Sequence, residues 1–172
     1  MKFINGILLK DSDYSGLLND IKKERLPLAC TGLSLITKAA IIRSIHSHTE
    51  RKAVVITHDE ASANELAADL SSMGLKCLNF PLRDYCIGNL SGYSREYEHK
   101  RTDTLSALAD GAFDLLTVSV DAATQLTVPP EILENARFTL KTGDIVDTSE
   151  LTERLLGAGY NRSELCEGAG QF

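Results

Sequence analysis

Short apolar runs alternate with segments of helical spacing along most of this chain. Continuous runs of this kind predict strands, and the runs at 52–57 (KAVVIT) and 113–120 (FDLLTVSV) predict burial on both sheet faces. The four expected strands are residues 26–30 (LPLAC), 52–57, 76–80 (KCLNF) and 113–120. The expected helices are residues 12–24, 34–48, 59–73 and 94–110. Repeated strand–helix units predict an α/β protein with a parallel sheet flanked by helices.

The ends of the expected helices carry recognisable signals. Ser12 or Asp13 is expected to cap the first helix, and the pair Thr57 and Glu60 forms a capping box before the helix at 59–73. Glycines at 74 and 111 are expected to end two helices. Residues 129–136 (PPEILENA) predict a short helix with proline in its first turn, and residues 82–93 predict a loop.

The character of the chain changes near Arg137. From there the sequence is more acidic and predicts strand, turn, helix, turn and strand, with Asp147 as a helix cap and Glu150 in the first turn. We therefore expect one domain over residues 1–136 and the start of a second over 137–172. The final residues, GAGQF, predict a strand without a following partner, so we expect a chain cut within a domain or an unpaired edge.

The stretch CTGLSLITKAAII, residues 30–42, lies where a phosphate-binding loop would lie, between an expected strand and an expected helix. In the pattern G-x-x-x-x-G-K-[ST], Gly32 fits the first glycine and Lys38 the lysine. Thr37 replaces the second glycine, and Ala39 has no oxygen with which to coordinate Mg²⁺. The stretch predicts a vestigial loop. An ordinary turn with a chance lysine and weak anion binding at the helix N-terminus are the alternatives.

Composition narrows the classes of function. The 172 residues carry a net charge of −6, so nucleic acid is not the obvious partner. No apolar run is long enough for a membrane helix and no signal peptide is recognisable, which predicts a cytoplasmic protein. Of the four cysteines, Cys77 and Cys86 could bind zinc together with His99, but their spacing favours idle or buried thiols.

Other candidate residues have simpler structural interpretations. Asp121 follows an expected strand, as the metal-binding aspartate of an ATPase would, but it has no acidic neighbour to act as a base. His46 and His48 are two residues apart and are expected to be solvated. No Ser/His/Asp or Cys/His arrangement is recognisable.

A group of aromatic and basic residues raises the possibility of nucleic-acid binding. Tyr85, Tyr93 and Tyr97 could stack on bases, with Arg95 and Arg101 on the phosphates. Packing of the loop and an exposed helix surface over residues 95–101 are the alternative interpretation, because charges of both signs are mixed there.

Four segments resemble one known family. They are residues 54–74, 79–111, 113–133 and 138–172, and the last contains the run LTERLLGAGY followed by E-x-G-x-F. These segments resemble the N-terminal region of the bacterial transcription-repair coupling factor, the Mfd family, and more distantly UvrB. The resemblance covers residues 26–172.

The resemblance implies a RecA-like, P-loop-NTPase-like domain similar to UvrB domain 1a over residues 1–136. Residues 137–172 would be the first half of a small α+β domain similar to UvrB domain 2, which recruits UvrA in nucleotide excision repair. The family's ATP- and Mg²⁺-dependent DNA motor and its RNA-polymerase contact lie elsewhere in the protein, and most UvrA-binding residues fall beyond Phe172.

The expectation is therefore a non-catalytic scaffold for this part of the protein. It would have no metal or cofactor and only a phosphate-loop relic at Gly32, Thr37, Lys38 and Ala39. The alternative is a divergent nucleotide hydrolase that uses the loop from Gly32 to Ala39, Lys38 in particular, together with Asp121.

Overall fold

The computed structural model describes residues 6–83 and 96–172, and these divide into two compact units, residues 1–125 and 126–172. The unit boundary lies earlier in the chain than the domain boundary expected after residue 136. The expected domains, 1–136 and 137–172, stay a prediction.

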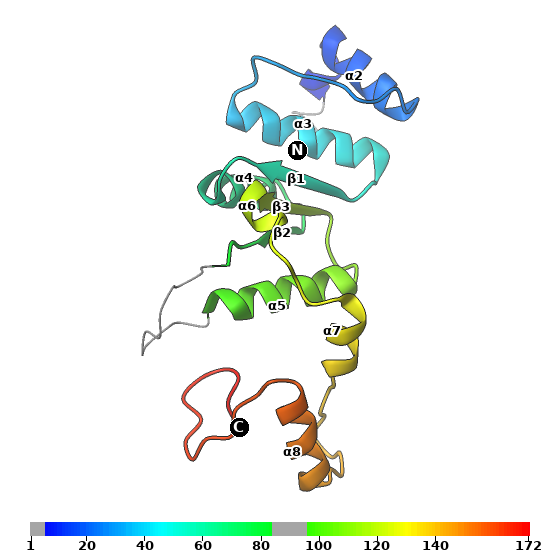
Figure 1. The fold of residues 1–172 in the computed structure, drawn as a ribbon. Coiled ribbons are helices and arrows are strands. Elements are labelled where there is room, and N and C mark those ends of the chain that lie inside the picture. Colours follow the sequence, from blue (N-terminus) through cyan, green and yellow to red (C-terminus); the bar gives the residue numbers. More distant parts are fainter. Residues whose placement is uncertain (1–5, 84–95) are drawn as a thin grey trace. The chain divides into compact units, whose positions relative to one another are not determined.

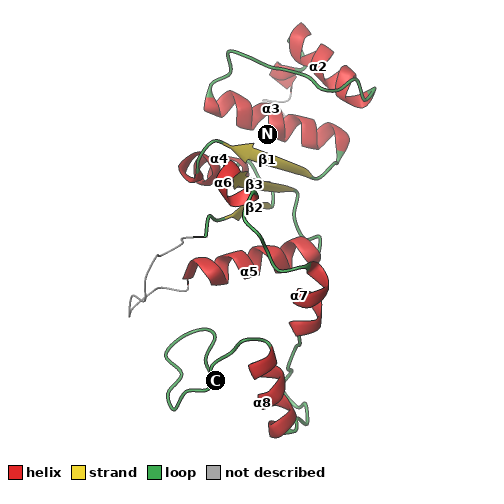
Figure 2. Ribbon diagram, viewed as in Figure 1, coloured by secondary structure: helices red, strands yellow, loops and turns green. Residues whose placement is uncertain are grey.

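A parallel sheet lies at the centre of the first unit. It contains β1 (Ala53–Thr57), β2 (Cys77–Phe80) and β3 (Leu115–Ser119) in the order β1-β3-β2 (Figure 1). Both Ala53 and Cys77 lie opposite Leu115, so the outer strands begin level with each other on β3. The helices α3 (Leu35–Thr49), α4 (Glu60–Ser72) and α5 (Glu96–Ala109) flank the sheet (Figure 2). The predicted α/β class is confirmed.

The strand expected at residues 26–30 is wrong, because these residues have no strand conformation and are exposed. Burial of residues 52–57 on both faces is also wrong. The side chains of Val54 and Ile56 are 59% and 61% exposed. An apolar run favours burial, but a strand is buried only where neighbouring strands and helices cover it, and within the described ranges only β3 pairs with β1. β3 lies between two strands, and its residues are mostly buried as predicted.

Two of the predicted helix caps are displaced by short distances along the chain. The first long helix, α2 (Ser12–Lys22), is capped by Asp11, whose carboxylate accepts bonds from the backbone N–H groups of Asp13 and Tyr14. The capping box of Thr57 and Glu60 is wrong, because Asp59 caps α4 through Ser62 N–H at 2.8 Å. The Asp59 carboxylate is the nearer acceptor once Thr57 has been incorporated into β1. Gly74 follows α4 with a φ of +87°, as predicted.

Two apolar clusters hold the helices on the sheet. On one face, Leu115 of β3 packs with Ala39 of α3 and with Leu66 and Leu70 of α4. On the other face, Val118 of β3 packs with Phe80 and with Ala122 of the short helix α6 (Val120–Ala123). The two clusters form because side chains alternate between the faces of a strand, which gives Leu115 and Val118 opposite directions.

The second unit contains α7 (Pro130–Ala136) and α8 (Thr148–Gly157). α8 is capped by Asp147, as predicted, through the N–H groups of Ser149 and Glu150. The two strands expected here are wrong, since residues 137–172 contain only a single bridge between Asn161 and Gln171. No residue of 126–172 is buried, so this unit has no core of its own.

None of the helices in the described part of the chain is long and apolar enough to cross a membrane.

Candidate functional site

The stretch that resembles a phosphate loop forms the start of a helix. Ser34 caps α3, and its Oγ accepts a bond from Thr37 N–H at 3.4 Å and shares a second bond of 2.8 Å with the Thr37 hydroxyl. The backbone N–H of Lys38 donates to Ser34 O at 2.9 Å. A working phosphate loop directs such N–H groups at the phosphates. Here the helix and its cap already use them.

The two positions that depart from the motif are fixed in different ways. Thr37 is in the first turn of α3, and its hydroxyl takes part in the cap. Ala39 has no exposed surface and packs against Leu66, Leu70 and Leu115. The position where a nucleotide site needs a Mg²⁺-binding hydroxyl is therefore part of the hydrophobic core. Gly32 keeps a positive φ of 74°, which favours glycine, but it lies in an exposed bend before the helix.

An apolar groove of about 520 Å³ runs beside this loop. Leu26, Leu28 and Cys30 line one wall, and residues 55–57 of β1 line the other. Ile41, Ile42 and Ile45 of α3 also line the groove. Lys38 is exposed at the groove, and Asp121 is not among the described residues that line it. This groove therefore does not bring together the two residues of the hydrolase alternative.

Three polar residues, His58, Asp59 and Ser62, lie close together after the end of β1. His58 Nε2 lies 3.2 Å from Asp59 Oδ2 and 3.5 Å from Ser62 Oγ. In a catalytic triad the imidazole uses one nitrogen for the nucleophile and the other for the acid. Here a single nitrogen faces both groups, and the His58 side chain is 82% exposed. The hydrogen bonds from Ser62 lower the pKa of Asp59, so the group serves as a helix cap.

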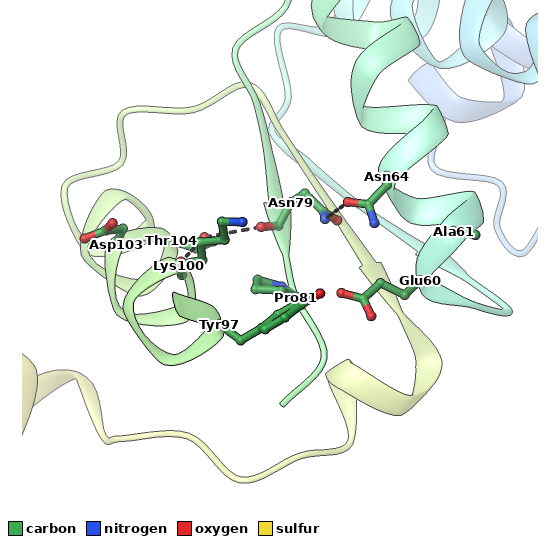
Figure 3. Close-up of a pocket in the computed structure, with 9 residues that line it drawn as sticks. All are labelled: Glu60, Ala61, Asn64, Asn79, Pro81, Tyr97, Lys100, Asp103 and Thr104. Carbon is green, nitrogen blue, oxygen red and sulfur yellow. Dashed lines mark hydrogen bonds between the residues drawn. The ribbon is translucent and has the colours of Figure 1, made fainter. Parts of the chain in front are cut away.

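A second hollow, of about 630 Å³, lies between α4, the end of β2 and α5 (Figure 3). Its centre is Asn79, whose side-chain N–H donates to Asn64 Oδ1 at 2.6 Å. The Asn79 Oδ1 accepts a bond from Thr117 Oγ1 at 3.0 Å, and the Asn79 backbone carbonyl accepts one from Thr104 Oγ1 at 3.2 Å. These polar groups thus bond to one another and hold β2 between its neighbours.

The rim of this second hollow carries charges of both signs. Glu60 and Asp103 are on it, as is Lys100, whose Nζ lies 5.7 Å from the centre of the Tyr97 ring. Glu60 Oε1 accepts a bond from Leu82 N–H at 3.3 Å, so this carboxylate holds the chain as it leaves β2. Thr104 Oγ1, a hydroxyl in the lining, donates to the backbone carbonyls of Asn79 and Lys100 and not to a carboxylate.

Arg101 is not on an exposed surface, which corrects the interpretation of residues 95–101 and of the nucleic-acid alternative. The side chain is buried, and its guanidinium lies 4.0 Å from the centre of the Phe80 ring. One of its nitrogens donates to Pro81 O at 2.6 Å and to Gln125 Oε1 at 3.0 Å. Arg101 therefore joins α5 to the ends of β2 and α6. A mixture of charges along the sequence does not show that one arginine among them is buried.

Of the other members of the nucleic-acid alternative, only Tyr97 lies among the described residues. Tyr85, Tyr93 and Arg95 lie outside the described residues, and Tyr97 is 46% exposed. Because Arg101 is buried, the described part of this group offers no basic surface for phosphates.

The histidines and cysteines have structural surroundings. His46 and His48 are half-buried rather than solvated, and the Nδ1 of each ring donates to a backbone carbonyl, Arg51 O at 2.9 Å and Ser44 O at 2.7 Å respectively. Burial raises the pKa of the Cys77 thiol, which is therefore a poor nucleophile at neutral pH. The zinc alternative includes Cys86, which lies outside the described residues, and the described residues contain no metal-binding group of three.

No protein-family model matches this chain. Its sequence is 26% identical to the transcription-repair-coupling factor of Staphylococcus aureus (strain USA300) over 167 residues, which cover 96% of this chain and 14% of that relative. It is 21% identical to the transcription-repair-coupling factor of Bacillus subtilis (strain 168) over 174 residues, which cover 100% of this chain and 15% of that relative. The chain thus spans about one seventh of the length of these relatives, and the similarity supports homology along nearly all of it.

Proposed function

We propose that this chain is a non-catalytic module that takes part in transcription-coupled nucleotide excision repair. The observation that carries the proposal is the similarity to transcription-repair-coupling factors along 96–100% of the chain. A similarity of this extent includes both compact units, so it does not depend on one short motif. The proposed place of the chain within such a protein is its N-terminal, UvrB-like region.

The structure of the loop supports a module without nucleotide chemistry. The N–H groups of Thr37 and Lys38 are used by the helix and its cap, and Ala39 is in the core. Phosphoryl transfer depends on positioned donors and a metal ion. The DNA motor of the proposed parent protein would be outside residues 1–172, as would its contacts with DNA and RNA polymerase.

We further propose that the module recruits UvrA and that it does so only when the second unit is complete. Residues 126–172 bury no side chain, and Leu126, Ile145 and Leu165 are 91%, 103% and 68% exposed. A segment that buries so little apolar surface cannot offset the entropy of ordering its chain. A preformed UvrA surface therefore needs more polypeptide than this chain supplies.

A biosensor titration with immobilised UvrA tests this proposal. Residues 1–172 are expected to bind weakly or not at all, and the complete gene product is expected to bind saturably. Leu165→Asp, a change on the second unit, is the variant expected to weaken the complex. Its control is Ile36→Asp, at an exposed position of α3. Equal affinity of the two polypeptides for UvrA would refute the need for a completed second unit. No binding by either polypeptide would refute recruitment.

Calorimetric titration with Mg²⁺-ATP tests the nucleotide alternative. We expect no binding heat from this chain or from Lys38→Ala, because the N–H groups of Thr37 and Lys38 are used by the helix and its cap and Ala39 has no metal-binding hydroxyl. Saturable heat that Lys38→Ala abolishes would instead assign a nucleotide-sensing role to the loop.

A further inference from the structure

We propose that the second hollow, between α4, the end of β2 and α5, binds an arginine side chain of a partner protein. The occupant would be an exposed segment of that partner, which places its guanidinium in the hollow (Figure 3). This inference does not depend on the proposed role in repair.

The hollow has the size of a ligand site and is lined from three elements. Its volume of about 630 Å³ lies within the range of small-molecule sites. Figure 3 shows that the side chains of Glu60 from α4 and Tyr97 from α5 extend toward one another beside Pro81. A group that enters the hollow therefore meets a carboxylate and an aromatic ring.

Several polar groups of the lining have bonding capacity left. Glu60 uses Oε1 for the N–H of Leu82, and no described residue bonds to its Oε2. The Asp103 side chain is exposed and has no hydrogen bond or ion pair with a described residue. The Asn64 amide uses Oδ1 for Asn79, and its Nδ2 has no partner in the described part of the chain. A ligand can therefore bond to these groups without breaking a bond of the fold.

The charges of the lining favour a cation. It contains two carboxylates, of Glu60 and Asp103, and a single ammonium, of Lys100. The Tyr97 ring already lies near that ammonium, 5.7 Å from Nζ, and it is 46% exposed. A guanidinium has five N–H donors in one plane, so it can donate to a carboxylate while it lies against an aromatic ring. A lysine ammonium is more strongly hydrated and has no flat face, so arginine is the favoured side chain.

The neighbouring backbone favours a side chain over an added β-strand as the occupant. The Asn79 carbonyl accepts a bond from Thr104 Oγ1 at 3.2 Å, so α5 lies against this edge of β2. A further strand would have to displace α5. A side chain needs no such change, and Asn64 Nδ2 can donate to a backbone carbonyl next to the partner's arginine.

A separate protein is favoured as the source of the arginine, because the hollow is already complete in the first unit. Its lining comes from residues 60–104, and both helices are packed on the sheet. Bonds from Glu60 and Thr104 hold the end of β2 between them. This distinguishes the hollow from the second unit, which has no core of its own.

NMR titration of residues 1–172 with capped tripeptides tests the proposal. The peptide Ala-Arg-Ala should shift the amide signals of α4 and α5 saturably, and Ala-Glu-Ala should not. Glu60→Gln and Asp103→Asn should each weaken binding of the arginine peptide by about tenfold. Glu60→Gln keeps an acceptor for the N–H of Leu82, so it tests charge and not folding. The matched control, Asp13→Asn, removes one negative charge at an exposed position of α2 and should change the affinity by less than about twofold.

Two further variants test the sign of the ligand's charge and the role of the ring. Lys100→Met removes a like charge from the lining, so it should strengthen binding of the arginine peptide by about threefold. A site for an anion would respond in the opposite direction. Tyr97→Leu should weaken binding by about threefold, because it removes the aromatic face.

Several results would overturn the proposal. The site would be refuted if the arginine peptide caused no saturable shift in α4 and α5, or if the glutamate peptide bound equally well. Equal weakening by Asp13→Asn would assign the binding to net charge, and weaker binding by Lys100→Met would assign the hollow to an anion. A complete gene product that does not bind the arginine peptide would mean that the same protein fills the hollow.

Discussion

Restoring the missing hydroxyl of the phosphate-loop pattern should damage the fold rather than restore a nucleotide site. The change is Ala39→Thr, at a position with no exposed surface that packs against Leu66, Leu70 and Leu115. Threonine adds two heavy atoms to this contact between α3, α4 and β3. The phosphate-loop pattern predicts that a hydroxyl at residue 39 restores a site, whereas the structure predicts that it destabilises the core.

The cost of Ala39→Thr follows from two terms. Forcing extra atoms into a packed core costs about 1–3 kcal/mol. The lower helix propensity of threonine adds about 0.5 kcal/mol. The new hydroxyl can bond to the carbonyl four residues earlier in the helix, so it need not remain without a partner. We therefore expect the free energy of unfolding to fall by about 1.5–3.5 kcal/mol, which lowers a urea midpoint by about 1–2 M.

Urea unfolding followed by far-UV circular dichroism measures this loss. The matched control is Ala68→Thr, the same substitution at an exposed position of α4, which should cost only the propensity difference. If Ala39→Thr destabilised the chain no more than Ala68→Thr, the packing of position 39 would be refuted. Mg²⁺-ATP binding by the double variant Thr37→Gly with Ala39→Thr would refute the structural account of the lost loop.

Three further predictions concern individual side chains. Arg101→Met should lower the free energy of unfolding by about 2–4 kcal/mol, because it leaves the Pro81 carbonyl unpaired. Lys100→Met, at an exposed position of the same helix, should change it little. A variant Arg101→Met that lost DNA binding without being destabilised would contradict this. Peptide-resolved maleimide labelling should find that Cys77 reacts more slowly than Cys30 at pH 7. Because the pKa of Cys77 is raised, its labelling rate should increase only at higher pH than that of Cys30. Equal rates would contradict the burial of Cys77. Because the pKa of Asp59 is lowered on folding, its carboxylate stabilises the folded state at pH values above the unfolded-state pKa. This contribution to the free energy of unfolding is lost as the pH falls through the folded-state pKa. The stability advantage over Asp59→Asn should therefore shrink on acidification, and a constant difference would contradict it.

Local signals predicted much of the first unit because they act over a few residues. The runs at 76–80 and 113–120 form β2 and β3, and Gly74 and Gly111 follow helices with positive φ angles as expected. The errors among the predicted strands are of one kind. Residues 26–30 have the composition of a strand, but a strand also needs a hydrogen-bonded neighbour, and no described segment supplies one.

The candidate site shows the same division. The sequence identified Thr37 and Ala39 as departures from the phosphate-loop pattern, because the absence of an oxygen at residue 39 is a covalent fact. It could not show that Ser34 and the first turn of α3 use the N–H groups, nor that Arg101 is buried on Phe80. The Ser34 bonds are local but depend on the backbone conformation of the loop, and the Arg101 contact joins residues distant in the chain; spacing along one segment contains neither.

The sequence by itself determined the α/β class, the positions of most helices and of the three strands β1, β2 and β3, and the chemical loss at residue 39. These follow from periodicity, turn residues and the atoms of each side chain. Only the tertiary structure decided which apolar runs become buried, that β1 is left with an open edge beside a groove, and that residues 126–172 lack a core. The burial of a segment depends on which other elements pack against it in space. A strand is buried only where neighbouring strands and helices of its sheet cover it.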